Sequence, residues 1–150
     1  MEVLKKVATV ADILEREIDA TIKEWLRRVK LVPELVRIPL SDAERTSHLP
    51  KLFHDLVCRL RLVNDAHPPI SVAAAAHGEV RRTQGYTAAM LIDESRAFQV
   101  STFSTLQIHQ AELDQSRMLL DVMVIADEVD AQLMETVRSL MGPKLAQTVA

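Results

Sequence analysis

Apolar residues recur every three or four positions along most of this chain, which is the spacing of one face of an α-helix. Leu14, Ile18, Ile22, Trp25 and Val29 form the first such stripe, with charged residues between them. No stretch shows the strict alternation that is typical of a half-buried strand. The stripes predict five or six helices, over about residues 9–30, from residue 41, from residue 50, and over residues 71–85, 88–113 and 115–141.

Residues that commonly begin and end helices stand at the predicted boundaries. Ser41-Asp42-Ala43-Glu44 has the pattern of a capping box, in which Ser41 caps a short helix and Glu44 reaches back. Ser71 and Thr87 are suited to cap the helices that follow them. Helix ends are predicted at His67-Pro68-Pro69, Gly85 and Gly142-Pro143, and a connection is predicted over residues 32–40.

Composition indicates a single all-α domain over residues 1–150. The chain is 48% hydrophobic and 26% charged, which is enough apolar material to enclose one core. Three glycines and six prolines leave little room for the many turns of an all-β fold.

The least ordinary stretch is His77-Gly78-Glu79-Val80-Arg81-Arg82-Thr83-Gln84-Gly85-Tyr86, which holds two of the three glycines and the only tyrosine. On a helix His77, Arg81 and Gln84 share one face, and Gly85 then ends the helix. Glu94 follows on the central helix among apolar residues, so its carboxylate is expected to be partly buried and to need a partner.

Two roles are open for this group. In the structural role, Glu94 pairs with Arg81 or His77 and joins two helices at the Gly85 corner. In the functional role, the group senses a ligand or transmits a shift between helices. Gly78 costs ~1 kcal/mol relative to alanine inside a helix, which predicts a close helix contact there, with the central helix as the candidate neighbour. The candidate cluster consists of His77, Gly78, Arg81, Gln84, Gly85, Tyr86 and Glu94.

The last predicted helix, about residues 115–141, is apolar on more than one side. One set of its residues alternates spacings of three and four, which is typical of a coiled-coil register. We expect one face to pack inside the domain and the other to meet a second copy of the chain; the alternative is a wide core face in a monomer. The candidate dimer interface consists of Leu119, Val122, Ala126, Val129, Leu133 and Leu140.

Charge and motifs exclude several kinds of chemistry. A net charge of -3 disfavours nucleic acid as a partner. A lone cysteine, Cys58, excludes an internal disulfide and a cysteine-based zinc site. No catalytic motif is present, so we expect no enzyme, no catalytic residue and no metal or cofactor site. No apolar run reaches membrane-spanning length and no signal peptide is visible, so we expect no membrane insertion and a cytoplasmic location.

The order of His77-Gly78, Arg81, Gln84-Gly85-Tyr86 and Glu94 resembles the N-terminal sensor domain of RsbR/RsbRD-type proteins. The front half agrees in layout, in Trp25 to Val29 and in Leu40-Ser41-Asp42 followed by His48-Leu49-Pro50. Where that family often has an aromatic and a basic residue after the glutamate, this chain has Ser95 and Gln99. The resemblance covers about residues 10–140 and implies a globin-like, all-α bundle that does not use haem.

The resemblance also implies a function. Such domains are dimeric input modules of bacterial signal-transduction proteins, stress-response regulators among them, and precede histidine-kinase or STAS output modules. We therefore expect a signal-sensing regulatory domain that acts by helix rearrangement in a homodimer, with the last helix leading to an output module or a partner protein. Two alternatives stay open, namely a small-molecule or haem-binding globin-like module and a stand-alone adaptor for protein interactions.

Overall fold

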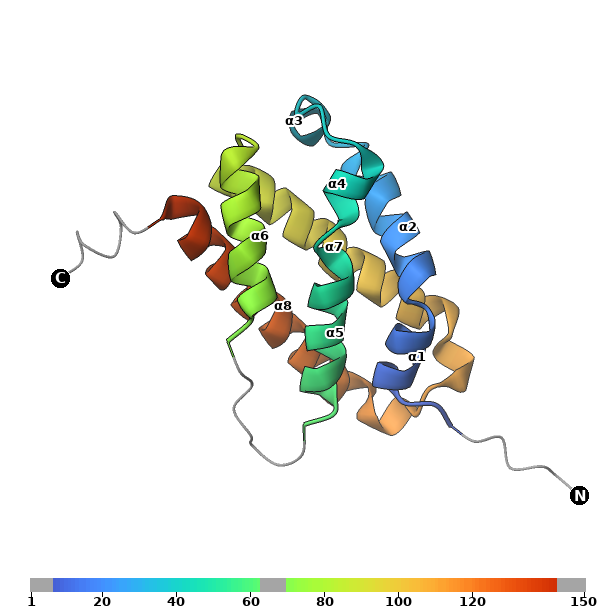
Figure 1. The fold of residues 1–150 in the computed structure, drawn as a ribbon. Coiled ribbons are helices and arrows are strands. Elements are labelled where there is room, and N and C mark those ends of the chain that lie inside the picture. Colours follow the sequence, from blue (N-terminus) through green and yellow to red (C-terminus); the bar gives the residue numbers. More distant parts are fainter. Residues whose placement is uncertain (1–6, 63–69, 143–150) are drawn as a thin grey trace, which may run out of the picture.

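The computed structural model describes residues 7–62 and 70–142, and these fold into a helical bundle (Figure 1). Within them the α-helices are α1 (Val10–Arg16), α2 (Ile18–Val29), α3 (Pro33–Val36), α4 (Asp42–Thr46), α5 (Leu49–Leu60), α6 (Val72–Thr83), α7 (Ala88–Ile108) and α8 (Met118–Met141). Two short 3-10 helices, Gln110–Glu112 and Gln115–Arg117, connect α7 to α8. The described residues form no strand beyond an isolated bridge between Ala8 and Leu113.

The helices form two layers. Figure 1 shows α1, α2, α5 and α6 in front of α7 and α8, which cross behind them. The most extensive helix contacts join the layers, between α6 and α8 and between α2 and α7, and α7 and α8 pack against each other as well. The all-α prediction is confirmed, and this arrangement is compatible with a globin-like bundle.

The observed helices are shorter and more numerous than the predicted ones. The helix predicted over residues 9–30 is divided at Glu17, whose backbone leaves the helical region (φ -101°, ψ 21°), so that α1 and α2 are separate. The predicted connection after residue 31 contains α3, because Pro33 suits the first turn of a helix even where it ends a preceding one. The central helix ends at Ile108 and α8 begins at Met118, since the intervening residues take 3-10 turns.

The predicted capping residues act as expected. Ser41 and Glu44 form a capping box on α4, and the hydroxyl oxygens of Ser71 and Thr87 accept hydrogen bonds from the first turns of α6 and α7. Gly142 follows α8 with φ 71°, a left-handed conformation that favours glycine. The predicted stop at His67-Pro68-Pro69, and Pro143, lie outside the described residues.

The core lies between the two layers and contains the only tryptophan, as predicted. Trp25 is fully buried, and its indole Nε1 donates a hydrogen bond to the backbone carbonyl of Glu94 on α7 at 3.1 Å. Phe53 of α5 stacks against Phe98 of α7 with ring centroids 4.5 Å apart. These contacts place the middle of α7 against both α2 and α5, which positions Glu94 at the centre of the bundle.

The predicted dimer interface on α8 divides between the core and the surface. Val129 and Leu140 are 2% and 9% exposed and pack inside the single chain, so those two positions are corrected to core positions. The reason is that the coiled-coil register runs obliquely across α8, while α5, α6 and α7 cover one side of the whole helix. Leu119, by contrast, is 75% exposed.

The surface of α8 nevertheless retains an apolar stripe, which we call the α8 stripe. It is made by Leu119, Met123, Met134 and Met141, each about half or more exposed. Their spacings of 4, 11 and 7 residues keep them on one side of the helix. Among the described residues, no helix is long and apolar enough to cross a membrane.

Candidate functional site

The predicted corner between α6 and α7 is present. Gly85 follows α6 with φ 87°, a backbone conformation that favours glycine. A Cβ at this position would meet no neighbour within 4 Å, so the preference for glycine comes from the backbone and not from crowding. The amide of Tyr86 donates to the carbonyl of Arg81 at 3.0 Å, and that of Gly85 donates to Arg82 at 3.2 Å. This pair of hydrogen bonds is the Schellman ending of a helix. It turns the chain so that Tyr86 and Glu94 face back toward α6.

Arg81 and Glu94 form a bidentate ion pair inside the bundle. The Nε of Arg81 lies 3.1 Å from Oε1 of Glu94, and its Nη2 lies 3.0 Å from Oε2. Arg81 is fully buried and Glu94 is 4% exposed. Two parallel N–H donors on one carboxylate satisfy both charges at once, which offsets the cost of removing them from water.

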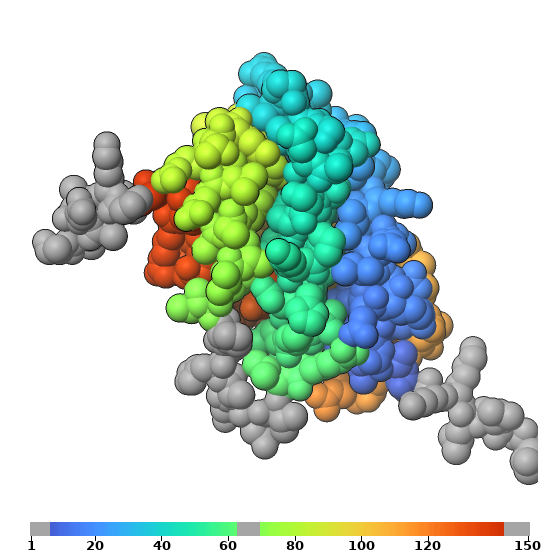
Figure 2. Space-filling model, in the orientation of Figure 1, coloured from blue at the N-terminus to red at the C-terminus, as the bar shows by residue number. Residues whose placement is uncertain are grey.

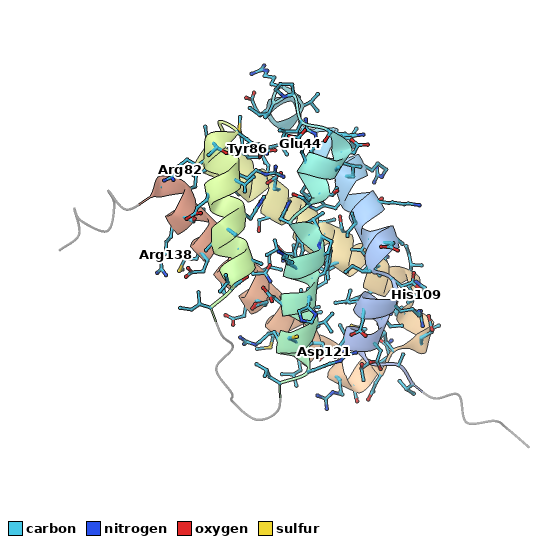
Figure 3. The ribbon with its side chains drawn as sticks, viewed as in Figure 1. Glu44, Arg82, Tyr86, His109, Asp121 and Arg138 are labelled. Carbon is cyan, nitrogen blue, oxygen red and sulfur yellow. The ribbon has the colours of Figure 1, made fainter. Side chains whose placement is uncertain are left out.

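The remaining donors of Arg81 join a third helix to the pair. Its Nη2 donates to the carbonyl of Arg45 at 2.8 Å and its Nη1 to the side chain of Gln84 at 2.7 Å. Tyr86 donates its hydroxyl to Oε2 of Glu94 at 3.1 Å, and its ring lies against the Arg81 guanidinium. Figure 3 shows Tyr86 and Glu44, a residue of α4, at the same end of the bundle. This network therefore joins α4, α6 and α7.

Two histidines lie against the carboxylate. His77 Nε2 lies 3.3 Å from Oε1 of Glu94, and the His77 ring stacks on that of His48 with centroids 3.5 Å apart. Burial lowers the pKa of His48 well below its ordinary value, and the charges of His77 and Arg81 lower it further. Burial also lowers the pKa of His77, against the hydrogen bond and charge of Glu94, which raise it. Both pKa values therefore lie below the ordinary value of histidine, which favours the neutral form of both rings.

Tyr86 is held in its neutral form as well. Burial and the nearby Glu94 carboxylate raise the pKa of Tyr86 to about 12. Its hydroxyl therefore stays protonated over the physiological range and remains a donor to Glu94.

A small cavity of about 30 Å³ lies beside the two imidazoles. It has room for about two water molecules. Side chains from five helices meet around it, including Trp25 of α2, His77 of α6, Glu94 of α7 and Gln132 of α8. The cavity therefore lies where a small displacement of any one of these helices changes the contacts of the others.

Gly78, next to His77, brings α6 directly onto α8. A Cβ at this position would overlap the carbonyl oxygen of Thr136 and lie 2.8 Å from Cβ of Ser139. Ser139 also donates its hydroxyl to the carbonyl of Ala75 on α6 at 2.5 Å. The predicted close contact is thus present, but its partner is α8 and not the central helix, because α6 crosses the last helix along the same face that carries Gly78.

His48, His77 and Glu94 also have the residue types of a metal site, with ligand atoms within 4.8 Å of one another. Their geometry fits a metal poorly. The two imidazole rings are stacked with their planes only 8° apart, so their lone pairs lie in separate, nearly parallel planes and do not converge on one ion. Both oxygens of Glu94 already accept hydrogen bonds from Arg81.

Haem does not fit this arrangement either. The stacked imidazoles occupy the space between α5 and α6, and a bound cofactor needs a site of roughly 300 Å³ or more. This geometry suits a buried polar network that links helices.

The structure brings together every member of the predicted cluster except the two glycines, which act through the backbone. Two participants were not predicted, His48 and Arg45. Arg45 is 6% exposed and donates to the carbonyls of Leu35 and Ile38. His48 precedes α5 and lies 29 positions before His77, so no helical spacing relates the two rings. An arginine within the capped turn of α4 likewise carries no periodic signal in the sequence.

Comparison of the chain with protein-family models, with curated proteins and with solved structures gave no match.

Proposed function

We propose that this domain is a signal-input module of the RsbR type, which acts as a homodimer and relays a change of helix packing to an output kinase or STAS module, or to a separate partner protein. The proposal draws on the sequence resemblance and on the connection between the buried network and α8. In this scheme the protein is a cytoplasmic bacterial regulator, and its two packing states differ by a shift of α6 relative to α8.

The observation that supports the relay best is the contact at Gly78. His77 and Arg81 fix α6 to Glu94 of α7, while Gly78, between them in sequence, lies directly against the backbone of α8. Backbone-to-backbone contacts leave no flexible side chain to absorb a displacement. A change in the hydrogen bonds of His77 or Glu94 is therefore passed on to α8 as a change in its position.

The α8 stripe supports the dimer. Its exposed leucine and methionines lie on the side of α8 away from the core, and Ala126 and Val137 between them are partly exposed. A second copy of the same helix would cover this side by the packing that coiled coils use.

The dimer is tested by the mass in solution of the domain with both Leu119→Lys and Met123→Lys. We expect the unaltered chain to show twice its 16.8 kDa mass in analytical ultracentrifugation, and the double variant to show the single mass. The matched control is Leu31→Lys, because Leu31 is 71% exposed but lies at the end of α2, far along the chain from α8. A single-chain mass for the unaltered protein, or an unchanged mass for the variant, contradicts the dimer.

The relay is tested separately by Glu94→Gln, which keeps the shape of the side chain and removes its charge. If the network biases α8, the dimer dissociation constant should change by about fivefold or more, the lower end of ordinary allosteric couplings. Glu34→Gln, an exposed pair partner of Arg37, is the control and should leave the constant unchanged. An unchanged constant in a folded Glu94→Gln protein refutes the relay and leaves the dimer standing; the adaptor alternative then becomes the better description.

A further inference from the structure

A second buried carboxylate, Glu128 of α8, lies away from the network and behaves differently. It is 4% exposed, and its Oε2 atom has no hydrogen-bond partner among the described residues. A buried polar atom without a partner costs about 1–3 kcal/mol, and more when the group is charged. Most buried polar groups in proteins are satisfied, so this atom calls for a specific explanation.

The side chain of Glu128 lines a pocket between α5, α6 and α8, with a volume of about 630 Å³. That volume is within the range of small-molecule sites, roughly 300–1,000 Å³. Figure 2 shows the surface hollowed between α5 and the lower part of α6. The volume of this pocket is about twenty times that of the cavity beside His77.

The wall of the pocket is mainly aliphatic. Its apolar members come from α5, from the first half of α6 and from the residues that flank these helices, and several are exposed although they are large: Val72 is 81% exposed and Ile70 is 72% exposed. Exposed apolar side chains gathered around one hollow mark binding sites more often than isolated ones do. The apolar wall consists of Pro50, Leu62, Ile70, Val72, Ala73 and Ala76.

The charges around Glu128 favour a cation. Burial has the largest effect and raises the pKa of the Glu128 carboxyl; the charge of Arg59 lowers this pKa, and the charges of Asp55 and Asp127 raise it. Arg59 is itself occupied, since its Nη2 donates to Asp127 at 3.0 Å. Lys51 and His54, which also line the pocket, are exposed side chains. Among the described residues, three carboxylates, those of Asp55, Asp127 and Glu128, therefore lie around one arginine, whose hydrogen bond goes to Asp127 and not to Glu128.

We infer that this pocket binds a small organic ammonium ion, with the aliphatic part of the ligand against the apolar wall and the ammonium group at Glu128. Such a ligand brings a positive charge in addition to that of Arg59, which is paired with Asp127, and hydrogen-bond donors for the Glu128 carboxylate, and it covers the exposed apolar side chains around the start of α6. A carboxylic acid of the same shape would add a further negative charge beside Glu128 and Asp55. The inference does not depend on the proposed dimer or on the output module.

The experiment compares three probes of one shape, n-hexylammonium, n-hexanol and n-hexanoate, by ligand-observed NMR titration at pH 8. We expect hexylammonium to bind at least tenfold more tightly than hexanol, and hexanoate to bind more weakly still. Equal binding of the three probes, or no binding of hexylammonium, overturns the inference, because the first outcome shows an apolar groove without charge recognition and the second shows no site.

Two variants locate the binding. Glu128→Gln keeps the shape of the side chain and should reduce hexylammonium affinity at least tenfold while leaving hexanol unchanged. Ala76→Phe should fill the pocket and weaken all three probes. Glu135→Gln, a change of the same kind on α8 but at a residue paired with Arg138, is the matched control and should have no effect. Unaltered hexylammonium binding by folded Glu128→Gln also overturns the inference.

Discussion

Two buried glutamates, Glu94 and Glu128, show the same chemical group in opposite situations. Each is 4% exposed and each lies on one of the two long helices. Glu94 accepts hydrogen bonds from Arg81 on both oxygens and from Tyr86 on one. Glu128 has an oxygen without a partner, and burial raises its pKa to about 7.

The difference lies in what each residue contributes to the folded state. A carboxylate that is fully paired holds helices together, and removing its cation leaves a buried charge. A carboxylate that lacks a partner lowers the stability of the fold, and proteins keep such groups mainly where a ligand or a reaction uses them. Burial alone therefore does not distinguish the two carboxylates; the number of their hydrogen-bond partners does.

The strongest test of the comparison is Arg81→Ala. This change leaves Glu94 buried beside two histidines, and it also removes the donors to the carbonyls of Arg45 and Glu44. We expect the free energy of unfolding to fall by about 3–5 kcal/mol, the usual cost of breaking a buried ion pair, as measured by urea denaturation at pH 7.

The neighbouring Arg82→Ala is its control. Arg82 is exposed, with its guanidinium beside Gly142 at the end of α8, so its loss should change the free energy by no more than about 0.5 kcal/mol. Equal effects of the two substitutions would mean that the ion pair contributes nothing specific.

Glu128→Gln should raise the free energy of unfolding, in contrast to Arg81→Ala, and the size of this effect should depend on pH. The folded pKa of Glu128, about 7, is above its ordinary value of 4.5, so the folded state keeps a proton that the unfolded state releases between these two values. The stability of the unaltered protein therefore falls as the pH rises through this window. The variant has no such loss and should be more stable by about 1–3 kcal/mol at pH 8 and unchanged at pH 4.5.

Urea denaturation of both proteins at the two pH values checks this expectation, since effects of other groups cancel in the difference. Glu135→Gln is again the control. A variant that is less stable at pH 8 would show that the Glu128 carboxylate has a stabilising partner and would remove the contrast with Glu94.

The smallest expected effect is that of Tyr86→Phe. The substitution removes one hydrogen bond to Glu94, yet the carboxylate keeps both donors of Arg81 and the phenylalanine ring fills the same space. A loss of about 1–2 kcal/mol in the free energy of unfolding is expected, because the bond is to a charged group but the charge stays paired. A loss as large as that of Arg81→Ala would show that Tyr86, and not the arginine, is the main partner of Glu94.

Much of this architecture can be read from the sequence alone. The spacing of apolar residues predicts the all-α fold, Ser41, Ser71 and Thr87 begin the helices they precede, and Gly85 ends α6. The sequence also predicts that Glu94 has a partner on α6, either Arg81 or His77. Local signals suffice there, because helix periodicity and capping depend on residues within a few positions of one another, and a charged residue on an apolar face must find a partner.

Other features of the domain depend on tertiary packing. The stacking of His48 on His77, the contact of Gly78 with α8 and the burial of Val129 and Leu140 depend on how whole helices cross. Glu128 gave no signal in the sequence, since an acidic residue on a long amphipathic helix ordinarily faces water. Helix crossing is set by the packing of many side chains at once, so the residues that it brings together share no spacing along the chain.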